Sequence, residues 1–181
     1  MTACGIPARS PGGKEADVTT DRPLANKVFQ IGYVVPDLHA AVRFFKETLG
    51  VPDFLVWENF MLEQQTYNGT PGDYLQSIAF GYLGDLQIEL IQPLSGESSY
   101  SAYLRRNPIG GVQHLGVLVD DFDAAVGAMT ARGFQAVQSG CHGDTRLVYF
   151  DTDDAGGTLT EIITIAPDER AMFERFKRGE R

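Results

Sequence analysis

Residues 112–121, VQHLGVLVDD, place His114 inside an apolar, β-branched run that ends in two acids. The chain carries a near-copy 84 positions earlier (114 − 30 = 84), FQIGYVVPD at residues 29–37. The copies match at Gly32 and Gly116, at Asp37 and Asp121, and at 40–42 and 124–126, which both read AAV. The sequence therefore predicts a duplicated fold.

The composition is typical of a folded protein with little affinity for polyanions. The chain has 181 residues, 43% hydrophobic and 10% aromatic, which excludes disorder of the whole chain. Its formal net charge of −9 repels nucleic acid and anionic membranes, and no apolar run reaches the roughly 18 residues of a membrane-spanning helix. Cys4 and Cys141 are too few for a disulfide framework or a thiolate metal site. We therefore expect a soluble, cytoplasmic protein with no nucleic-acid or membrane partner.

The pattern along the chain divides it into five segments. Residues 1–26 are rich in Gly, Pro, Ser, Thr and charge without strand or helix periodicity, which predicts a flexible tail. A first βαβββ module is predicted over 27–94 and a second over 112–166, with a linker at 95–111. The C-terminal helix, 167–181, carries an apolar stripe typical of a core or a subunit contact, formed by Met172, Phe173 and Phe176.

Each module is expected to begin with a strand and a helix and to end with strands. Asp37 is a typical helix N-cap and Gly50 a typical helix end. The predicted helices are Leu38–Thr48 and Asp123–Ala131, with a short one at Tyr100–Arg106 in the linker and a terminal one at Asp168–Lys177. The predicted strands are Val28–Val35, Val51–Phe60, Ser77–Tyr82, Leu86–Ile91, Val112–Val119, Phe134–Gln138, Arg146–Asp151 and Thr158–Ile165.

The first module is the longer one. Gln30 and Glu89 are 59 residues apart, whereas His114 and Glu161 are 47 apart, a difference of 12. We place the extra residues in the polar, Gly- and Pro-punctuated segment Glu63–Asp73, which predicts a loop. Such an insertion suggests a lid or wall and favours a bulkier or more apolar substrate.

Four residues carry the chemical signal, one near the start of the first strand and one within the last strand of each module: Gln30, Glu89, His114 and Glu161. Both glutamates lie in apolar strands, where an unpaired carboxylate costs several kcal/mol of desolvation. A divalent cation compensates both, because two carboxylates supply −2 and the neutral imidazole and amide supply nothing.

Taken singly, each of these residues has an ordinary structural explanation. A strand histidine is more often a hydrogen-bonded core residue than a ligand, and a strand glutamate can point to solvent. Taken together, all four pseudo-symmetric positions hold oxygen or nitrogen ligands. The set therefore predicts one divalent metal ion, which is zinc, nickel, cobalt, manganese or iron at such a mixed site.

The near-copies QIGYVVPDLHAAV and HLGVLVDDFDAAV and the strand-borne glutamates resemble the vicinal oxygen chelate superfamily, which includes glyoxalases, bleomycin resistance proteins and dioxygenases. The resemblance covers about 27–166. It implies an α+β fold in which two tandem βαβββ modules form a curved mixed sheet with a concave metal site. The Gln/Glu/His/Glu order is similar to that of glyoxalase I, whereas GDLQIELIQP and VDDFDAAV are closer to the methylmalonyl-CoA epimerase-like branch.

This chain differs from each of these kinds of protein at positions that matter for their activities, so not every activity of the superfamily is expected. Val34 and Pro93 stand where glyoxalase I has the residues that hold glutathione. The epimerases usually show histidine first and glutamine second, where this chain has Gln30 and then Glu89. Gln30 also replaces the first histidine of the iron triad of the extradiol dioxygenases, so ring cleavage is disfavoured.

The chemistry that remains is proton transfer beside a carbonyl. We predict a divalent-metal-dependent isomerase or epimerase that acts through a metal-stabilised enolate on a small carbonyl-containing substrate. The resemblance implies Glu161 as the base and Glu89 on the opposite face, in a homodimer. The alternatives are a glyoxalase I-like lyase and a non-catalytic binder of antibiotic-type molecules.

Other residues stay unassigned at this point. Glu58 and Glu63 are weaker candidates for a second acid, and His142 is interpreted as a lone loop histidine. Several apolar residues are candidates for a pocket wall, although most such residues belong to a core: Phe54, Trp57, Phe60, Met61, Tyr67, Phe80, Tyr82 and Phe150.

Overall fold

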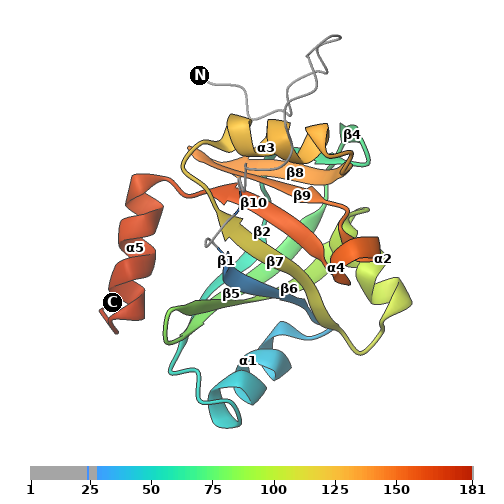
Figure 1. Cartoon of the computed structure of the whole chain (residues 1–181). Helices are drawn as coiled ribbons and strands as arrows, with labels where there is room; N and C mark the ends of the chain where they lie inside the picture. The colour runs from blue at the N-terminus through green and yellow to red at the C-terminus, as the bar shows by residue number, and fades with distance from the viewer. Residues whose placement is uncertain (1–23, 25–27, 181) are drawn as a thin grey trace.

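The two near-copies form neighbouring strands at the centre of one sheet (Figure 1). In the computed structural model, which describes residues 24 and 28–180, β1 (Val28–Val34) pairs antiparallel with β7 (Gly111–Leu118). The sheet has ten strands in the order β2-β5-β6-β1-β7-β10-β9-β8-β3-β4. The predicted modules therefore join edge to edge within one chain, as an α+β fold with a mixed sheet. Apart from Leu24, the predicted tail lies outside the described residues.

The remaining elements follow the predicted order with small differences in their bounds. The helices are α1 (Leu38–Glu47), α2 (Ser99–Arg106), α3 (Phe122–Ala131), α4 (Asp153–Gly156) and α5 (Pro167–Lys177). The remaining strands are β2 (Phe54–Phe60), β3 (Glu63–Tyr67), β4 (Thr70–Pro71), β5 (Leu75–Leu83), β6 (Leu86–Ser95), β8 (Ala136–His142), β9 (Thr145–Phe150) and β10 (Leu159–Thr164).

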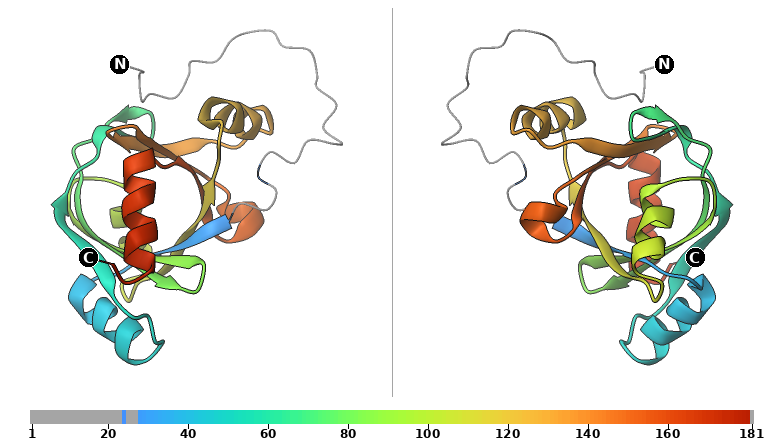
Figure 2. Two further views of the ribbon diagram at one scale, coloured as in Figure 1. Left: turned by 90° about the vertical axis from the view of Figure 1, so that its left-hand side faces the viewer. Right: turned by 90° about the vertical axis from the view of Figure 1, so that its right-hand side faces the viewer.

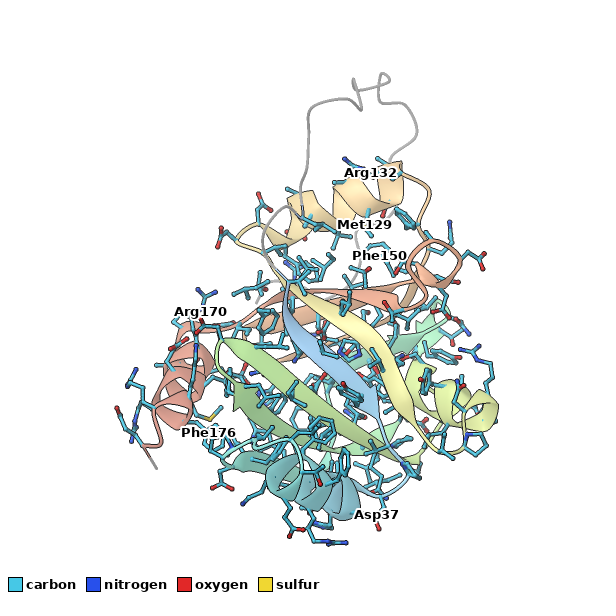
Figure 3. The ribbon with its side chains drawn as sticks, turned by 60° about the horizontal axis from the view of Figure 1, so that its bottom comes forward. Asp37, Met129, Arg132, Phe150, Arg170 and Phe176 are labelled. Atoms are coloured by element: carbon cyan, nitrogen blue, oxygen red, sulfur yellow. The ribbon has the colours of Figure 1, made fainter. Side chains whose placement is uncertain are left out.

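The repeated Asp begins the helix of each module. The Asp37 carboxylate accepts a hydrogen bond from the Ala40 amide at 2.8 Å, and Asp121 accepts one from Ala124 at 2.9 Å. Each helix then packs on the convex face of its own half of the sheet. Figure 3 shows Met129 of α3 above Phe150 of β9, and both belong to one buried cluster. The duplicated sequence thus produces two equivalent helix-on-sheet layers.

The segment Glu63–Asp73 is not a loop, and this prediction was wrong. It forms the hairpin β3–β4, whose turn residues Asn68 and Gly69 have φ of 49° and 76°. An Asn-Gly pair is the strongest short-range signal for this kind of turn. The polar composition hid the strand because β3 pairs with β8 of the other module, a partner that the local pattern does not reveal.

This hairpin curls the sheet. Only Met61 and Leu62 separate β2, at one end of the strand order, from β3, next to the other end. Leu62 is buried and lies over Gly140 of β8, where an added Cβ would be 2.9 Å from the leucine side chain. The concave face is therefore enclosed, and Figure 2 shows α5 across one end of the curl and α2 across the other. Phe173 of α5 and Tyr100 of α2 belong to the cluster inside it.

Two smaller differences from the prediction concern β8 and α4. β8 begins two residues later than predicted and extends to His142, which is therefore a strand residue rather than a loop histidine. The short helix α4 was not predicted, since its four residues carry too little periodicity.

Among the described residues, no helix has the length and apolar character needed to cross a membrane.

We expect the closure of the sheet by Leu62 to contribute strongly to stability. Leu62→Ala should lower the free energy of unfolding by about 2–5 kcal/mol, because it leaves a cavity in the buried cluster. The neighbouring Met61 is 50% exposed, so Met61→Ala should change the free energy of unfolding by less than about 0.5 kcal/mol. Urea unfolding of both variants measures the difference. Equal stability of the two would contradict a closing role for Leu62.

Candidate metal centre

The four predicted ligands come from the four central strands of the sheet. Glu89 lies on β6, Gln30 on β1, His114 on β7 and Glu161 on β10, and these strands are neighbours in that order. All four side chains are buried. Ligand atoms of Glu89, His114 and Glu161 all lie within 4.8 Å of one another.

The matched glycines explain how side chains from neighbouring strands converge. Gly32 pairs with His114 on one side and Glu89 on the other, and a Cβ added to Gly32 would lie 1.9 Å from the imidazole Cε1. Gly116 pairs with Gln30 and Glu161, and its Cβ would lie 2.4 Å from Gln30 Oε1 and 3.1 Å from Glu161 Oε2. Each glycine thus leaves space for one ligand from its own module and one from the other.

Four buried polar atoms of the site make no hydrogen bond of good geometry to the described residues, although two of them lie within ion-pair distance of a third. Within the described residues, the unpartnered buried atoms include Gln30 Oε1, Glu89 Oε2, His114 Nε2 and Glu161 Oε2. His114 Nε2 lies 3.0 Å from Glu89 Oε2 and 3.7 Å from Glu161 Oε2. An orphaned buried carboxylate is costly, and one nitrogen with three oxygens is a donor set that suits a divalent transition metal. The residues therefore fit the ion that their pattern predicts.

The protein alone leaves these charges poorly balanced. Burial raises the pKa of Glu161 to about 7, the charge of Glu89 adds to this rise, and His114 and a hydrogen bond from Tyr149 oppose it. Burial lowers the pKa of His114, but contact with Glu89 and the charge of Glu161 outweigh burial and raise it. Both shifts follow from placing acidic groups and an imidazole close together in a buried site.

A second layer of side chains orients the ligands. Gln113 Oε1 lies 2.7 Å from His114 Nδ1. Because an amide oxygen only accepts, Nδ1 donates, which leaves the Nε2 lone pair of the neutral ring for a metal. Gln30 donates its amide to Gln87 at 2.7 Å, and its oxygen stays free. Tyr149 donates to Glu161 and accepts from Tyr100 at 2.9 Å.

This second layer was not predicted from the sequence. Gln87 was detectable, since it lies two residues before Glu89 and so shares its face of the strand. Tyr149 was not, because its position opposite Glu161 depends on the register between β9 and β10.

A cavity of about 50 Å³ lies beside three of the four predicted ligands, Gln30, Glu89 and Glu161, and reaches α5. Three glutamates line it: Glu89, Glu161 and Glu169. Of the aromatic candidates, Trp57, Phe60 and Phe80 line it, together with Phe173 from the apolar stripe of α5. That stripe is thus a cavity wall as well as a core element.

Other candidates lie elsewhere. Phe54 and Phe150 belong to the two clusters behind the sheet, and Met61 is exposed. Glu58 contacts Ser77 and His39, and Glu63 is exposed, so neither lines the cavity. His142 does line it, and its Nδ1 lies 2.5 Å from Glu169 Oε1. The interpretation of His142 as a lone histidine was therefore wrong.

Known proteins resemble this chain in sequence and in fold. Residues 29–150 match the family described as the Glyoxalase/Bleomycin resistance protein/Dioxygenase superfamily. The human mitochondrial methylmalonyl-CoA epimerase is 28% identical over 137 residues, covering 73% of this chain and 70% of that protein. An ethylmalonyl-CoA/methylmalonyl-CoA epimerase of Cereibacter sphaeroides is 27% identical over 144 residues, covering 77% of this chain and 98% of that protein.

A solved structure shares the fold. The crystal structure of methylmalonyl-CoA epimerase from Mycobacterium tuberculosis superposes with a TM-score of 0.57 at 23% identity, covering 83% of this chain and 95% of that one. The curved sheet built from two modules is therefore a fold that has been solved before.

The close approach at Gly32 has a testable consequence. Gly32→Ala should force the His114 ring away and destabilise the protein by about 1–3 kcal/mol. Gly127 lies in α3, and a Cβ added there would have nothing within 4 Å, so Gly127→Ala should be neutral or stabilising by up to about 1 kcal/mol. Urea unfolding compares the two. A Gly32→Ala protein as stable as the Gly127→Ala protein would refute this packing of His114 over Gly32.

Proposed function

Because the chain belongs to the glyoxalase/bleomycin resistance protein/dioxygenase superfamily, we propose that it is a divalent-metal-dependent epimerase or isomerase that removes and returns a proton beside a carbonyl group. The observation that carries the proposal is the set of four buried ligand atoms without a hydrogen bond, of which those of Gln30, Glu89 and Glu161 belong to residues that line a cavity. The relatives support it, since the human and Cereibacter sphaeroides proteins are epimerases of acyl-CoA thioesters.

The metal would be held by Gln30 Oε1, Glu89 Oε2, His114 Nε2 and Glu161 Oε2, which are the unpartnered atoms. When bound, a divalent ion supplies a Lewis acid that polarises the carbonyl and stabilises the charge of the enolate. The aromatic wall and α5 limit access of water to the acids beneath them.

The two glutamates have distinct roles in the proposed reaction. The Glu161 carboxylate takes the α-proton and becomes a carboxylic acid, while the electron pair of the C–H bond moves toward the carbonyl oxygen. Glu89, on the opposite side of the site, would first take a proton from solvent and then donate it to carbon from the other face, and Glu161 would release the proton that it took to solvent. The hydrogen bond from Tyr149 holds the Glu161 carboxylate in place, and Gln113 fixes the ring of His114.

The alternatives are less well supported. A glyoxalase I-like lyase needs polar groups that hold glutathione, but Val34 is fully buried in the core and Pro93 has no polar side-chain atom. A non-catalytic binder needs no metal, and it would leave two buried carboxylates with His114 as the one ion-pair partner that the described residues give them. We keep a homodimeric, cytoplasmic enzyme as part of the proposal.

Metal binding is the first requirement of the proposal. Protein stripped with a chelator should gain about 2.7 kcal/mol of stability from an ion present at 100 times its Kd. His114→Ala should abolish this gain, whereas Glu63→Gln, an exposed change on β3, should preserve it. Thermal unfolding with Zn²⁺, Ni²⁺, Co²⁺ or Mn²⁺ measures the effect. A stripped protein that none of these ions stabilises would refute the metal site.

Proton exchange tests the chemistry. The wild-type protein should exchange the α-proton of 2-methyl-branched acyl-CoA thioesters for deuterium, as followed by proton NMR in D₂O. Glu161→Gln should slow this exchange by about 10²–10⁴-fold, the usual contribution of a general base. Glu58→Gln, outside the cavity, is the matched control and should change the rate less than about twofold.

Measuring the metal content of the Glu161→Gln protein separates the role of Glu161 as a metal ligand from its role as the general base. Slow exchange with a full complement of metal supports Glu161 as the base. Fast exchange in the variant would remove Glu161 from that role. No exchange by the wild-type protein, despite ligand-dependent thermal stabilisation, would favour the non-catalytic binder.

A further inference from the structure

The lining of the cavity combines an aromatic wall with acidic side chains. We infer that the protein takes acyl substrates whose α-carbon carries apolar substituents and no carboxylate group. The inference rests on the proposed function, because it names the substrate class of the same site. It distinguishes this chain from its relatives, which are named for methylmalonyl-CoA and ethylmalonyl-CoA, thioesters that do carry that carboxylate.

The charges in the cavity carry the first step. Among its lining residues, all of them in the described part of the chain, three are glutamates and none is Lys or Arg. A divalent ion bound by Glu89 and Glu161 forms a neutral centre. The third acid, Glu169, contacts His142 Nδ1 at 2.5 Å and the hydroxyl of Thr145. A substrate carboxylate in this space would therefore meet three acids, with no Lys or Arg beside them and with His142 already paired to Glu169.

The aromatic wall carries the second step. Phe80 of β5 pairs in register with Glu89 of β6, so the wall begins directly beside a ligand of the predicted metal. The Trp57 ring centroid lies 5.1 Å from that of Phe80. A substituent on the carbon next to a carbonyl held at the metal would contact this wall, which favours apolar groups.

Helix α5 completes the wall. The Phe173 ring centroid lies 5.1 Å from that of Phe80 and 6.2 Å from that of Trp57. Glu169, one helical turn before Phe173, lies against β8 and β9 through His142 and Thr145. The helix thus contributes an aromatic ring and an acid, but no Lys or Arg, to the lining of the cavity.

Binding can be read without turnover, because Trp57 is the single tryptophan of the chain and lines the cavity. We would titrate the metal-loaded protein with isobutyryl-CoA and methylmalonyl-CoA, which differ by a methyl group in place of a carboxylate, and with 2-phenylpropanoyl-CoA. Tryptophan fluorescence should give a Kd at least tenfold lower for the isobutyryl than for the methylmalonyl thioester, and lowest for the phenylpropanoyl one. Equal or tighter binding of methylmalonyl-CoA would overturn the inference.

Two variants test whether the acids set this preference. Glu89→Gln removes one negative charge at the predicted metal, and Glu169→Gln removes one at the α5 end without touching a predicted ligand. Each should shift the ratio of the two Kd values at least tenfold toward the methylmalonyl thioester. Glu63→Gln, exposed and outside the cavity, should leave the ratio unchanged. An unchanged ratio in the folded Glu169→Gln protein would contradict the electrostatic argument.

Deuterium exchange on the same ligands separates this inference from the proposed function. Preferential binding of the apolar thioesters without any α-proton exchange would refute the proposed epimerase activity and support the inferred preference for apolar thioesters. Fast exchange and tightest binding of methylmalonyl-CoA would support the enzyme and refute the substrate class.

Discussion

The structure depends on two glycines at the junction of β1 and β7, because a predicted ligand from the neighbouring strand packs over each of them. His114 lies over Gly32, and Gln30 lies over Gly116, because no Cβ occupies the space above either glycine. Since Glu89 and Glu161 flank the same glycines on the outer sides, four strands deliver four ligand side chains to one place. The duplicated sequence therefore specifies the fold and the site together.

Much of this arrangement could be predicted from the sequence. The near-copies predicted two modules, Asp37 was correctly predicted to cap a helix, and the family and the curved α+β fold are confirmed. The four candidate ligands were chosen because equivalent positions of equivalent modules meet, and the structure places them side by side. Their role as metal ligands stays a prediction.

Several features that the sequence did not predict depend on contacts between distant segments. The hairpin β3–β4 finds its partner in β8, and Tyr149 reaches Glu161 only through the register of β9 and β10. His142 gains its environment from Trp57 and Glu169, 85 residues before it and 27 residues after it (142 − 57 = 85; 169 − 142 = 27). Local periodicity determines strands and helices, whereas the wall of a cavity depends on which of them become neighbours.

The central claim is that four buried, unpartnered atoms form a metal site, and anomalous diffraction from a crystal grown with Co²⁺ or Zn²⁺ tests it most directly. We predict one anomalous peak about 2.0–2.2 Å from Gln30 Oε1, Glu89 Oε2, His114 Nε2 and Glu161 Oε2. Density for water alone at this position, with no anomalous signal at a saturating concentration of the ion, would contradict it.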